Sequence, residues 1–188
     1  MSELSVNDLK TSMKVEIDNA PYVVVSNQFV KPGKGQAFNR IRVKNLLTSR
    51  TVEKTYKSTE KLKLADVEET RMRLLYLEQD AAVFMSDESF EQVSVAFSVI
   101  KDNKQWLKDD IVYDLIFYKG SVIDLLTPTF MELKITESDP GVRGDSSSGR
   151  VLKPATLETG AKVQVPIFVN QGETIKVDTR TCEYVSRV

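Results

Sequence analysis

Histidine is absent from this sequence, and cysteine occurs only once, as Cys182. Histidine is the commonest general base and the commonest metal ligand in proteins, so its absence argues against acid–base catalysis and against a histidine metal site. A lone cysteine excludes an internal disulfide and, without histidine, a Cys–His catalytic pair or a Cys/His zinc site. We therefore expect no catalytic residues, no metal and no enzymatic activity.

Long apolar runs are also missing. No stretch approaches the roughly 20 apolar residues that a membrane-spanning helix needs, and residues 1–14 alternate charged and apolar side chains in place of a signal core. With 41% hydrophobic and 28% charged residues, the composition is that of a folded globular protein. The chain is therefore predicted to be cytoplasmic, with no membrane partner.

The formal net charge of −1 hides a segregation of charge along the chain. Residues 1–64 carry 12 Lys and Arg against 6 Asp and Glu, residues 65–127 carry 6 against 13, and residues 128–188 carry 8 against 8. A basic segment beside an acidic one favours contact of the basic end with a polyanion. Chance variation between small domains is the alternative explanation.

Short alternating segments bounded by turn residues predict an all-β protein. Residues 38–45 are the clearest example, because Ile41 and Val43 face one side of the expected strand and basic residues face the other. Residues 98–109 fit one short helix, and residues 139–150 fit a long polar surface loop. The other expected strands are 13–17, 22–29, 52–56, 70–77, 82–85, 90–93, 111–117, 121–126, 130–135, 162–169, 174–177 and 183–188.

The pattern and charge change near residue 64, and Thr127-Pro128 opens a further segment, which predicts domains at 1–64, 65–127 and 128–188. Several short strands with regular turn signals favour small β-barrels. Domains of about 60 residues bury only about 60% of the surface of the unfolded chain. We therefore expect neighbouring domains to pack on one another.

The sharpest local feature is the segment VKPGKGQAF at residues 30–38. Pro32 presets φ at the first central position of a turn, and Gly33 tolerates a positive φ at the second. Lys34 then lies between Gly33 and Gly35, so one long cation is predicted to project from a thin tip. The strand that follows extends this positive charge with three exposed cations, Arg40, Arg42 and Lys44.

The same spacing also fits an ordinary hairpin with a solvated lysine. It does not fit a phosphate-binding P-loop, because the GxxxxGK[ST] pattern is missing. Composition and spacing alone leave the choice between a functional tip and a plain turn open.

The wider sequence resembles the elongation factor P family. The similarity begins with VKPGKGQAF and covers essentially the whole chain, most strongly at its two ends. It continues in RIRVKNLLTSRTVEKTYKS (40–58), ITESDPGVRGDSSSG (135–149), KPATLETGAKVQVPIFVNQGETIKVDTR (153–180) and EYVSRV (183–188). The resemblance implies three small β-barrels in an L-shaped arrangement: an SH3-like, KOW-type domain followed by two OB-type barrels.

The resemblance also implies a function. Proteins of this family bind the ribosome next to peptidyl-tRNA and promote peptide-bond formation at stalled polyproline sequences. The implied partners are the ribosome, peptidyl-tRNA, mRNA and a lysine-modifying enzyme, with no DNA and no membrane, and the chain is expected to be a monomer. No cofactor is implied beyond a covalent modification of Lys34, where many bacteria attach a β-lysyl group.

Individual positions match the functional residues of the family. Gly144, Asp145 and Ser146 match a Gly-Asp-Thr loop that approaches the exit-site codon, with a serine replacing the threonine. Tyr184 and Arg187 match C-terminal contacts to tRNA. The loop implied to approach the tRNA acceptor end contains Lys31, Pro32, Gly33, Lys34 and Gly35.

Departures from the family pattern fall at turns: Ser49 stands where Thr-Gly is usual, residues 78–82 lack the usual Asn-Asp-Gly, and Cys182 replaces a glycine. Two other classes of function stay open. A general OB-fold RNA-binding protein would use basic grooves with aromatic stacking platforms, although the OB-like segments here are acidic or neutral. A protein-interaction adaptor would dock through its acidic middle domain.

Overall fold

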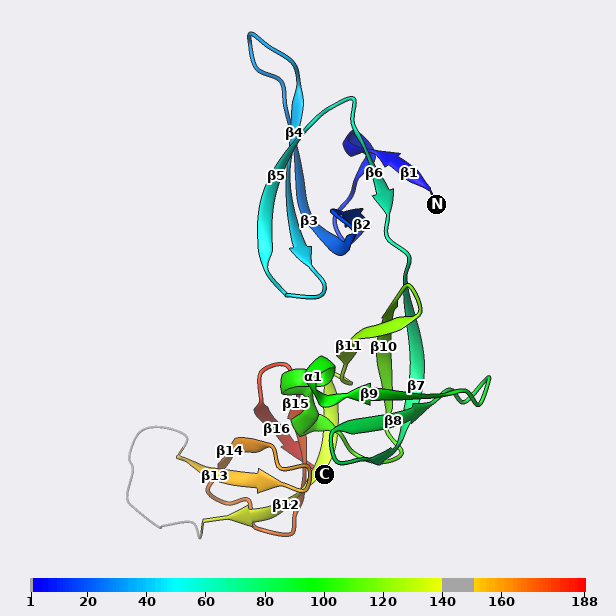
Figure 1. Ribbon diagram of the computed structural model, residues 1–188. Helices are drawn as coiled ribbons and strands as arrows, with labels where there is room; N and C mark the ends of the chain where they lie inside the picture. The colour runs from blue at the N-terminus through cyan, green and yellow to red at the C-terminus, as the bar shows by residue number, and fades with distance from the viewer. Residues whose placement is uncertain (1, 140–150) are drawn as a thin grey trace. The chain divides into compact units, whose positions relative to one another are not determined.

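The computed structural model describes residues 2–139 and 151–188 (Figure 1). Strands make up most of the described chain, which confirms the prediction of an all-β protein. The chain forms two compact units, one built from residues 1–70 and 115–124 and the other from residues 71–114 and 125–188. No helix in the described part of the chain is long and apolar enough to cross a membrane.

Six strands of the first unit form a sheet in the order β1-β6-β2-β3-β4-β5. A short 3-10 helix, η1 (Val6–Asp8), follows the first strand. The hydrophobic core of this sheet contains the buried aliphatic residues Val6, Leu9, Val15, Ile17, Val24, Ile41 and Val43. The strands are β1 (Glu3–Ser5), β2 (Lys14–Ile17), β3 (Ala20–Val30), β4 (Phe38–Asn45), β5 (Thr51–Lys57) and β6 (Lys61–Leu64).

A second, five-stranded sheet has the order β11-β10-β7-β8-β9. The helix expected over residues 98–109 is instead two short pieces, α1 (Phe97–Ile100) and η2 (Lys101–Trp106). Lys101 has φ of 51°, which an α-helix cannot accommodate, so α1 ends there. The strands are β7 (Val67–Leu77), β8 (Ala81–Met85), β9 (Gln92–Ala96), β10 (Val112–Tyr118) and β11 (Ser121–Leu126).

The last five strands close into a barrel in the order β12-β13-β14-β16-β15. Alternate residues of β12, such as Leu133 and Ile135, point inward and are almost fully buried, as the period of a strand requires. The strands are β12 (Phe130–Ser138), β13 (Leu152–Leu157), β14 (Lys162–Pro166), β15 (Thr174–Asp178) and β16 (Glu183–Arg187).

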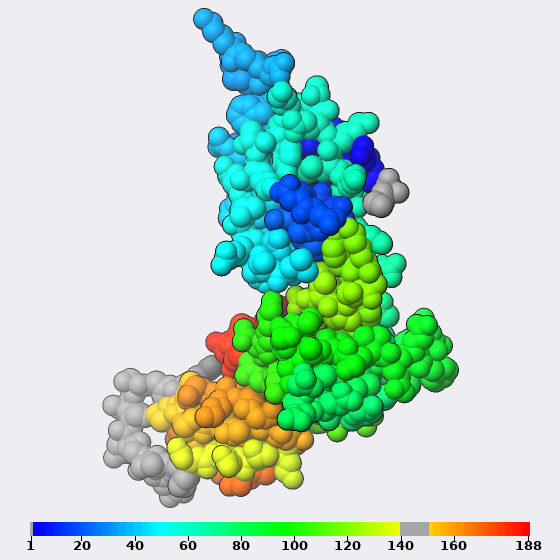
Figure 2. All heavy atoms as spheres, viewed as in Figure 1, coloured from blue at the N-terminus to red at the C-terminus, as the bar shows by residue number. Residues whose placement is uncertain are grey.

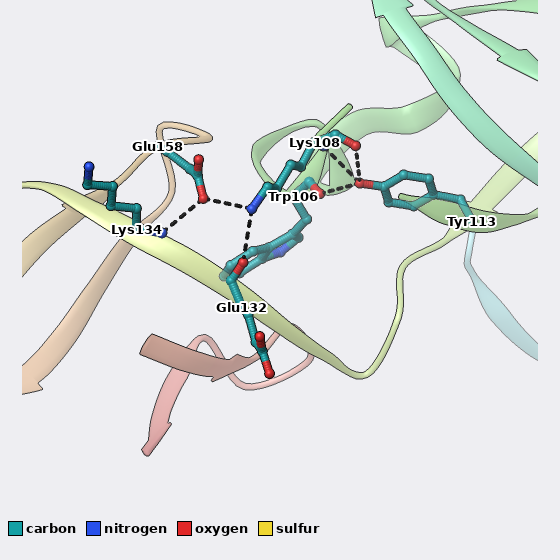
Figure 3. A network of polar contacts seen from close by, with 6 residues as sticks. All are labelled: Trp106, Lys108, Tyr113, Glu132, Lys134 and Glu158. Atoms are coloured by element: carbon teal, nitrogen blue, oxygen red, sulfur yellow. Dashed lines mark hydrogen bonds and ion pairs between the residues drawn. The ribbon is translucent and has the colours of Figure 1, made fainter. Parts of the chain in front are cut away.

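Trp106, at the end of η2, belongs to the buried core of this barrel, although it lies outside the barrel strands in the sequence (Figure 3). The Tyr113 hydroxyl donates to the Trp106 carbonyl at 2.8 Å and accepts from the Lys108 amide at 2.9 Å. Burial raises the pKa of Tyr113 to about 12. The Lys108 ammonium also reaches Glu158 Oε1 at 2.9 Å. Segments before and after residue 127 therefore pack together in the second unit, as expected for small domains.

A polar cluster joins two hairpins within the first unit. The Tyr118 hydroxyl donates to Glu16 Oε2 at 2.7 Å, and the Lys119 ammonium lies 2.9 Å from the same oxygen. Lys119 also donates to Asn19 Oδ1 at 3.0 Å. These bonds lower the pKa of Glu16, first through Lys119 and then through Tyr118. The turn between β10 and β11 is thereby fixed to the turn between β2 and β3.

Candidate functional site: an exposed lysine loop on a basic hairpin

Strands β3 and β4 form a long antiparallel hairpin whose last paired residues are Val30 and Phe38. Residues 31–37 connect the two strands beyond this last pair, and the loop projects from the sheet as a narrow tip (Figure 2). Lys34 lies in the middle of the loop and is exposed. The structure therefore places a long cationic side chain at the end of a thin protrusion, where it can enter a narrow cleft.

The two glycines of the loop do not have the backbone conformations that the sequence predicted. Gly35 has φ of 111°, whereas Gly33 does not have a positive φ. The predicted positive φ at Gly33 is therefore wrong. The reason is the length of the connection: it spans residues 31–37, so the chain reverses further along, at Gly35. A Cβ at Gly35 would lie 3.8 Å from Pro32 Cγ, so the strain of a substitution there would come from its φ and not from crowding.

The outer face of β4 is basic, as the alternation predicted. Arg40, Arg42 and Lys44 are exposed, while Ile41 and Val43 between them are fully buried. The residues of β5 that lie opposite these three cations are polar, and one of them is the carboxylate Glu53. Arg40 Nε lies 3.4 Å from Glu53 Oε1, and Arg42 pairs with Glu53 across the strands. Because both members of the Arg40–Glu53 pair are about half exposed, the pair is weak and an external phosphate can compete for the arginine.

The inner face of the hairpin contains a polar network that sequence reasoning missed. Asn39 is only 1% exposed, and its Nδ2 donates to Asn27 Oδ1 at 3.0 Å. The Ser58 hydroxyl donates to Asn39 Oδ1 at 3.3 Å. The signal was present in the alternation of residues 38–45, since a period of two puts Asn39 on the same face as Ile41. The network lies directly below the lysine loop.

The second unit carries the other two predicted tRNA contacts on β16. Tyr184 pairs with Val177, and Arg187 pairs with Ile175, but a register shift between these pairs adds one residue to β16. Residues three apart in a regular strand point to opposite faces, whereas an extra residue restores them to one face. The register shift thus puts Tyr184 and Arg187 on the same face of β16, and Arg187 Nη1 lies 3.7 Å from Glu173 Oε1.

Tyr184 also lines a groove of about 900 Å³ on the barrel surface. Phe168 lies in the same groove with 60% of its surface exposed, and the exposed thiol Cys182 is a third member. Gly144, Asp145 and Ser146, predicted to approach the exit-site codon, lie outside the described residues. In residues 2–139 and 151–188, no cluster of three or more carboxylate or thiol side chains could hold a metal ion.

Three family models match successive parts of the chain. The KOW-like domain of elongation factor P (EF-P) matches residues 5–62, its OB domain matches residues 67–125, and its C-terminal domain matches residues 131–187. Elongation factor P 2 of Protochlamydia amoebophila is 60% identical over 188 residues, which are 100% of this chain and 99% of that protein. The chain belongs to the elongation factor P family. Elongation factor P 2 of Chlamydia muridarum is 56% identical over the same 188 residues, with the same coverage.

Solved structures show a related fold outside the elongation factor P family. Eukaryotic translation initiation factor 5A from Methanococcus jannaschii aligns with a TM-score of 0.53 and 19% identity, covering 67% of this chain and 97% of that one. A translation initiation factor eIF-5A family protein from Naegleria fowleri aligns with a TM-score of 0.54 and 13% identity, covering 67% and 96%. At these identities the likeness supports the fold alone. Membership of the elongation factor P family makes the chain a translation elongation factor.

Proposed function

We propose that this protein binds the ribosome next to peptidyl-tRNA and promotes peptide-bond formation at stalled polyproline sequences, with Lys34 as the working residue. The observation that carries the proposal is the exposed Lys34 in a loop that extends beyond the last strand pair of a basic hairpin. The exposed cations of β4 supply phosphate contacts along the stem of this hairpin. Lys34 is then directed toward the acceptor end of the tRNA.

The proposed role requires no acid or base from the protein. Proline is a poor nucleophile with restricted geometry, so holding the reactants in place is where a bound factor helps. Positioning alone can lower the activation free energy by several kcal/mol, and by roughly 7–11 kcal/mol in well-oriented systems. The reaction itself belongs to ribosomal RNA, and the protein acts as a positioning factor and not as an enzyme.

Covalent extension of Lys34 is a further part of the proposal. The exposed ε-amine attacks the activated carboxyl group of β-lysine, so that an amide bond forms, the activating group leaves and the amine loses a proton; a lysine-modifying enzyme supplies the activated β-lysine. The mRNA contact is assigned to the segment containing Gly144, Asp145 and Ser146, and the tRNA contacts of the barrel to Tyr184 and Arg187. Intact mass measurement of the protein purified from its own organism detects the added group.

The experiment that tests the proposal compares Lys34→Ala and Lys34→Arg with Lys61→Ala, an exposed lysine on β6 of the same sheet. Relief of stalling on a polyproline reporter should be lost in Lys34→Ala, because the tip no longer carries an amine. Lys34→Arg keeps the charge without an acylatable amine, so it separates the two contributions. Lys61→Ala should behave as wild type. Full activity in folded Lys34→Ala would contradict the proposal.

A general RNA-binding function is the second candidate, and the groove with Phe168 and Tyr184 is the observation that favours it. The exposed ring of Phe168 on this barrel can stack with an unpaired base, with the half-buried Tyr184 beside it in the groove. The two functions differ in competition. A ribosomal factor prefers ribosomes that carry peptidyl-tRNA over free oligonucleotides, whereas a general binder holds free oligonucleotides tightly. A protein-interaction adaptor would neither co-sediment with ribosomes nor bind free oligonucleotides.

A further inference from the structure

We propose that Asn39, whose side chain is buried, and its half-buried partners Asn27 and Ser58 are positioning residues that fix the direction in which the lysine hairpin leaves the sheet. This inference rests on the proposed function of Lys34. None of the three residues lies in the loop itself, so they act through the position of Lys34 and not by contact with the tRNA.

The placement of Asn39 is unusual for a core position. Its inward neighbours on β4, Ile41 and Val43, are fully buried, and Asn39 itself is 1% exposed. Burying an amide without hydrogen bonds costs several kcal/mol, on the order of 1–3 in protein mutants, so an aliphatic residue would be the simpler choice for packing. Here both polar atoms of the amide are satisfied, Nδ2 by Asn27 and Oδ1 by Ser58. The Asn39 amide therefore makes directional hydrogen bonds on a face of the sheet where the other side chains are aliphatic and make only non-directional packing contacts.

The network ties both strands of the hairpin to the segment around η1. Asn27, on β3, donates through Nδ2 to the Val6 carbonyl at 2.8 Å and to the Leu9 carbonyl at 3.0 Å. Val6 and Leu9 are themselves core residues, so these acceptors are held in place by packing. Asn39 carries the connection from β3 to β4.

Ser58 extends the network to the end of the loop. Its amide donates to the Ala37 carbonyl at 3.2 Å, and its own carbonyl accepts from Asn7 Nδ2 at 2.9 Å. Ala37 is the residue at which the loop returns to β4. The base of the loop and η1 are thus joined through the main chain of Ser58, and the side chains of Asn27 and Asn39 connect Ser58 to both hairpin strands and to the carbonyls of Val6 and Leu9.

Because Lys34 lies far from the network, a small change in the angle of the hairpin at the network produces a large displacement of Lys34. Lys34 lies five positions before Asn39, and at about 3.3 Å per residue these five steps span up to about 16 Å. A tilt of about 10° at the base would move the tip by about 3 Å over that length. Misplacement of a reacting group by about 1 Å costs on the order of 100-fold in rate. A small loss of angular definition at the network should therefore reduce the rate without reducing ribosome binding.

The test uses Asn39→Leu, which keeps a side chain of similar size and removes both bonds of the amide. The measurements are the half-saturating factor concentration and the maximal rate of Pro–Pro bond formation on ribosomes stalled with peptidyl-tRNA. We expect a half-saturating concentration within about twofold of wild type and a maximal rate lower by about tenfold or more. If Asn39 had only a structural role, the half-saturating concentration and the maximal rate would either both change or both stay the same.

A distance measurement gives a readout that does not depend on activity. Spin labels at Gln36→Cys in the loop and Lys61→Cys on β6, in a Cys182→Ser background, report how the tip is oriented against its own sheet. The distribution of label distances should broaden in Asn39→Leu. An unchanged distribution together with a wild-type maximal rate in the folded variant would overturn the inference.

Ser58 supplies a second pair of variants that keeps the test decisive if Asn39→Leu fails to fold. Ser58→Ala removes the hydroxyl bond to Asn39, whereas Ser58→Thr retains a hydroxyl. The maximal rate should fall in Ser58→Ala and recover in Ser58→Thr, and equal wild-type rates in both would overturn the inference. Lys34→Ala is assayed alongside: if it keeps the full rate, the proposed function fails, and the distance distributions alone decide the role of the network.

Discussion

Trp106 offers the clearest test of how the second unit is held together. The indole is 2% exposed and packs within the buried core of the barrel formed by β12–β16 (Figure 3). A buried tryptophan removes roughly 200 Å² from water, worth about 5 kcal/mol at 25 cal/mol per Å². Measured Trp→Ala substitutions in cores cost about 3–5 kcal/mol. We therefore expect Trp106→Ala to lower the free energy of unfolding by about 4 kcal/mol.

The assay is urea unfolding followed by far-ultraviolet circular dichroism, since the variant lacks the only tryptophan. With a slope of about 2 kcal/mol per M, the urea midpoint should fall by about 2 M. Phe168→Ala is the matched control, because that aromatic ring lies on the same barrel but is 60% exposed, and it should shift the free energy by about 0.5 kcal/mol or less. A midpoint for Trp106→Ala within about 0.5 M of wild type, at an unchanged slope, would refute the claim that the indole completes the barrel core.

Two further predictions concern charged groups. The pKa of Glu16 is lowered in the folded protein, so its bonds to Lys119 and Tyr118 stabilise the fold above the ordinary carboxyl pKa and are lost as the pH falls through the lowered value. Glu16→Gln should therefore lose less unfolding free energy than wild type between pH 6 and pH 3; equal losses would show that this contact does not contribute. Reversal of the three exposed cations of β4 to glutamate should flatten the dependence of ribosome affinity on salt, by a slope of about 2–3 if each meets one phosphate. An unchanged slope would place the main electrostatic contact elsewhere.

Local patterns in the sequence predicted the part of the fold that positions the candidate site. Strand β4 has the predicted bounds Phe38–Asn45, and its alternation correctly separates a buried aliphatic face from a basic one. The strands expected at residues 111–117 and 121–126 leave residues 118–120 for a tight connection, and Lys119 and Gly120 there have the two positive φ values of a hairpin turn. These features depend on neighbouring residues alone, which is why sequence reasoning reached them.

Features that depend on distant contacts escaped the prediction. Strand β13 contains Pro154, which cannot donate a ladder hydrogen bond and usually argues against a strand, yet it pairs there with Gln164 on β14. Strand β1 has only three residues and owes its existence to pairing with β6. The insertion of Trp106 into a barrel that begins 24 residues later has no local signal. The side chain is placed by the packing it completes.

At the candidate site, too, features set by neighbouring residues were predicted and features set by distant contacts were not. Exposure of Lys34 followed from its glycine and proline neighbours, whereas the assignment of positive φ to Gly33 failed, because the loop is longer than the turn assumed. The network of Asn27 and the buried Asn39 could be suspected from an amide on an apolar face, but its acceptors at Val6 and Leu9 lie far away in the sequence. The bulge that aligns the tail residues of β16 also depends on its partner strand.

The most direct test of the central claim is the single-turnover rate of Pro–Pro bond formation on purified ribosomes stalled with peptidyl-tRNA. Wild-type protein and Lys34→Ala are compared at saturating concentration, with Lys61→Ala as the control from the same sheet. If the amine at the hairpin tip positions the acceptor end, wild type and Lys61→Ala should accelerate the reaction equally. Lys34→Ala should bind the ribosome and leave the rate near that without any factor. Acceleration by Lys34→Ala equal to that of wild type would contradict the account.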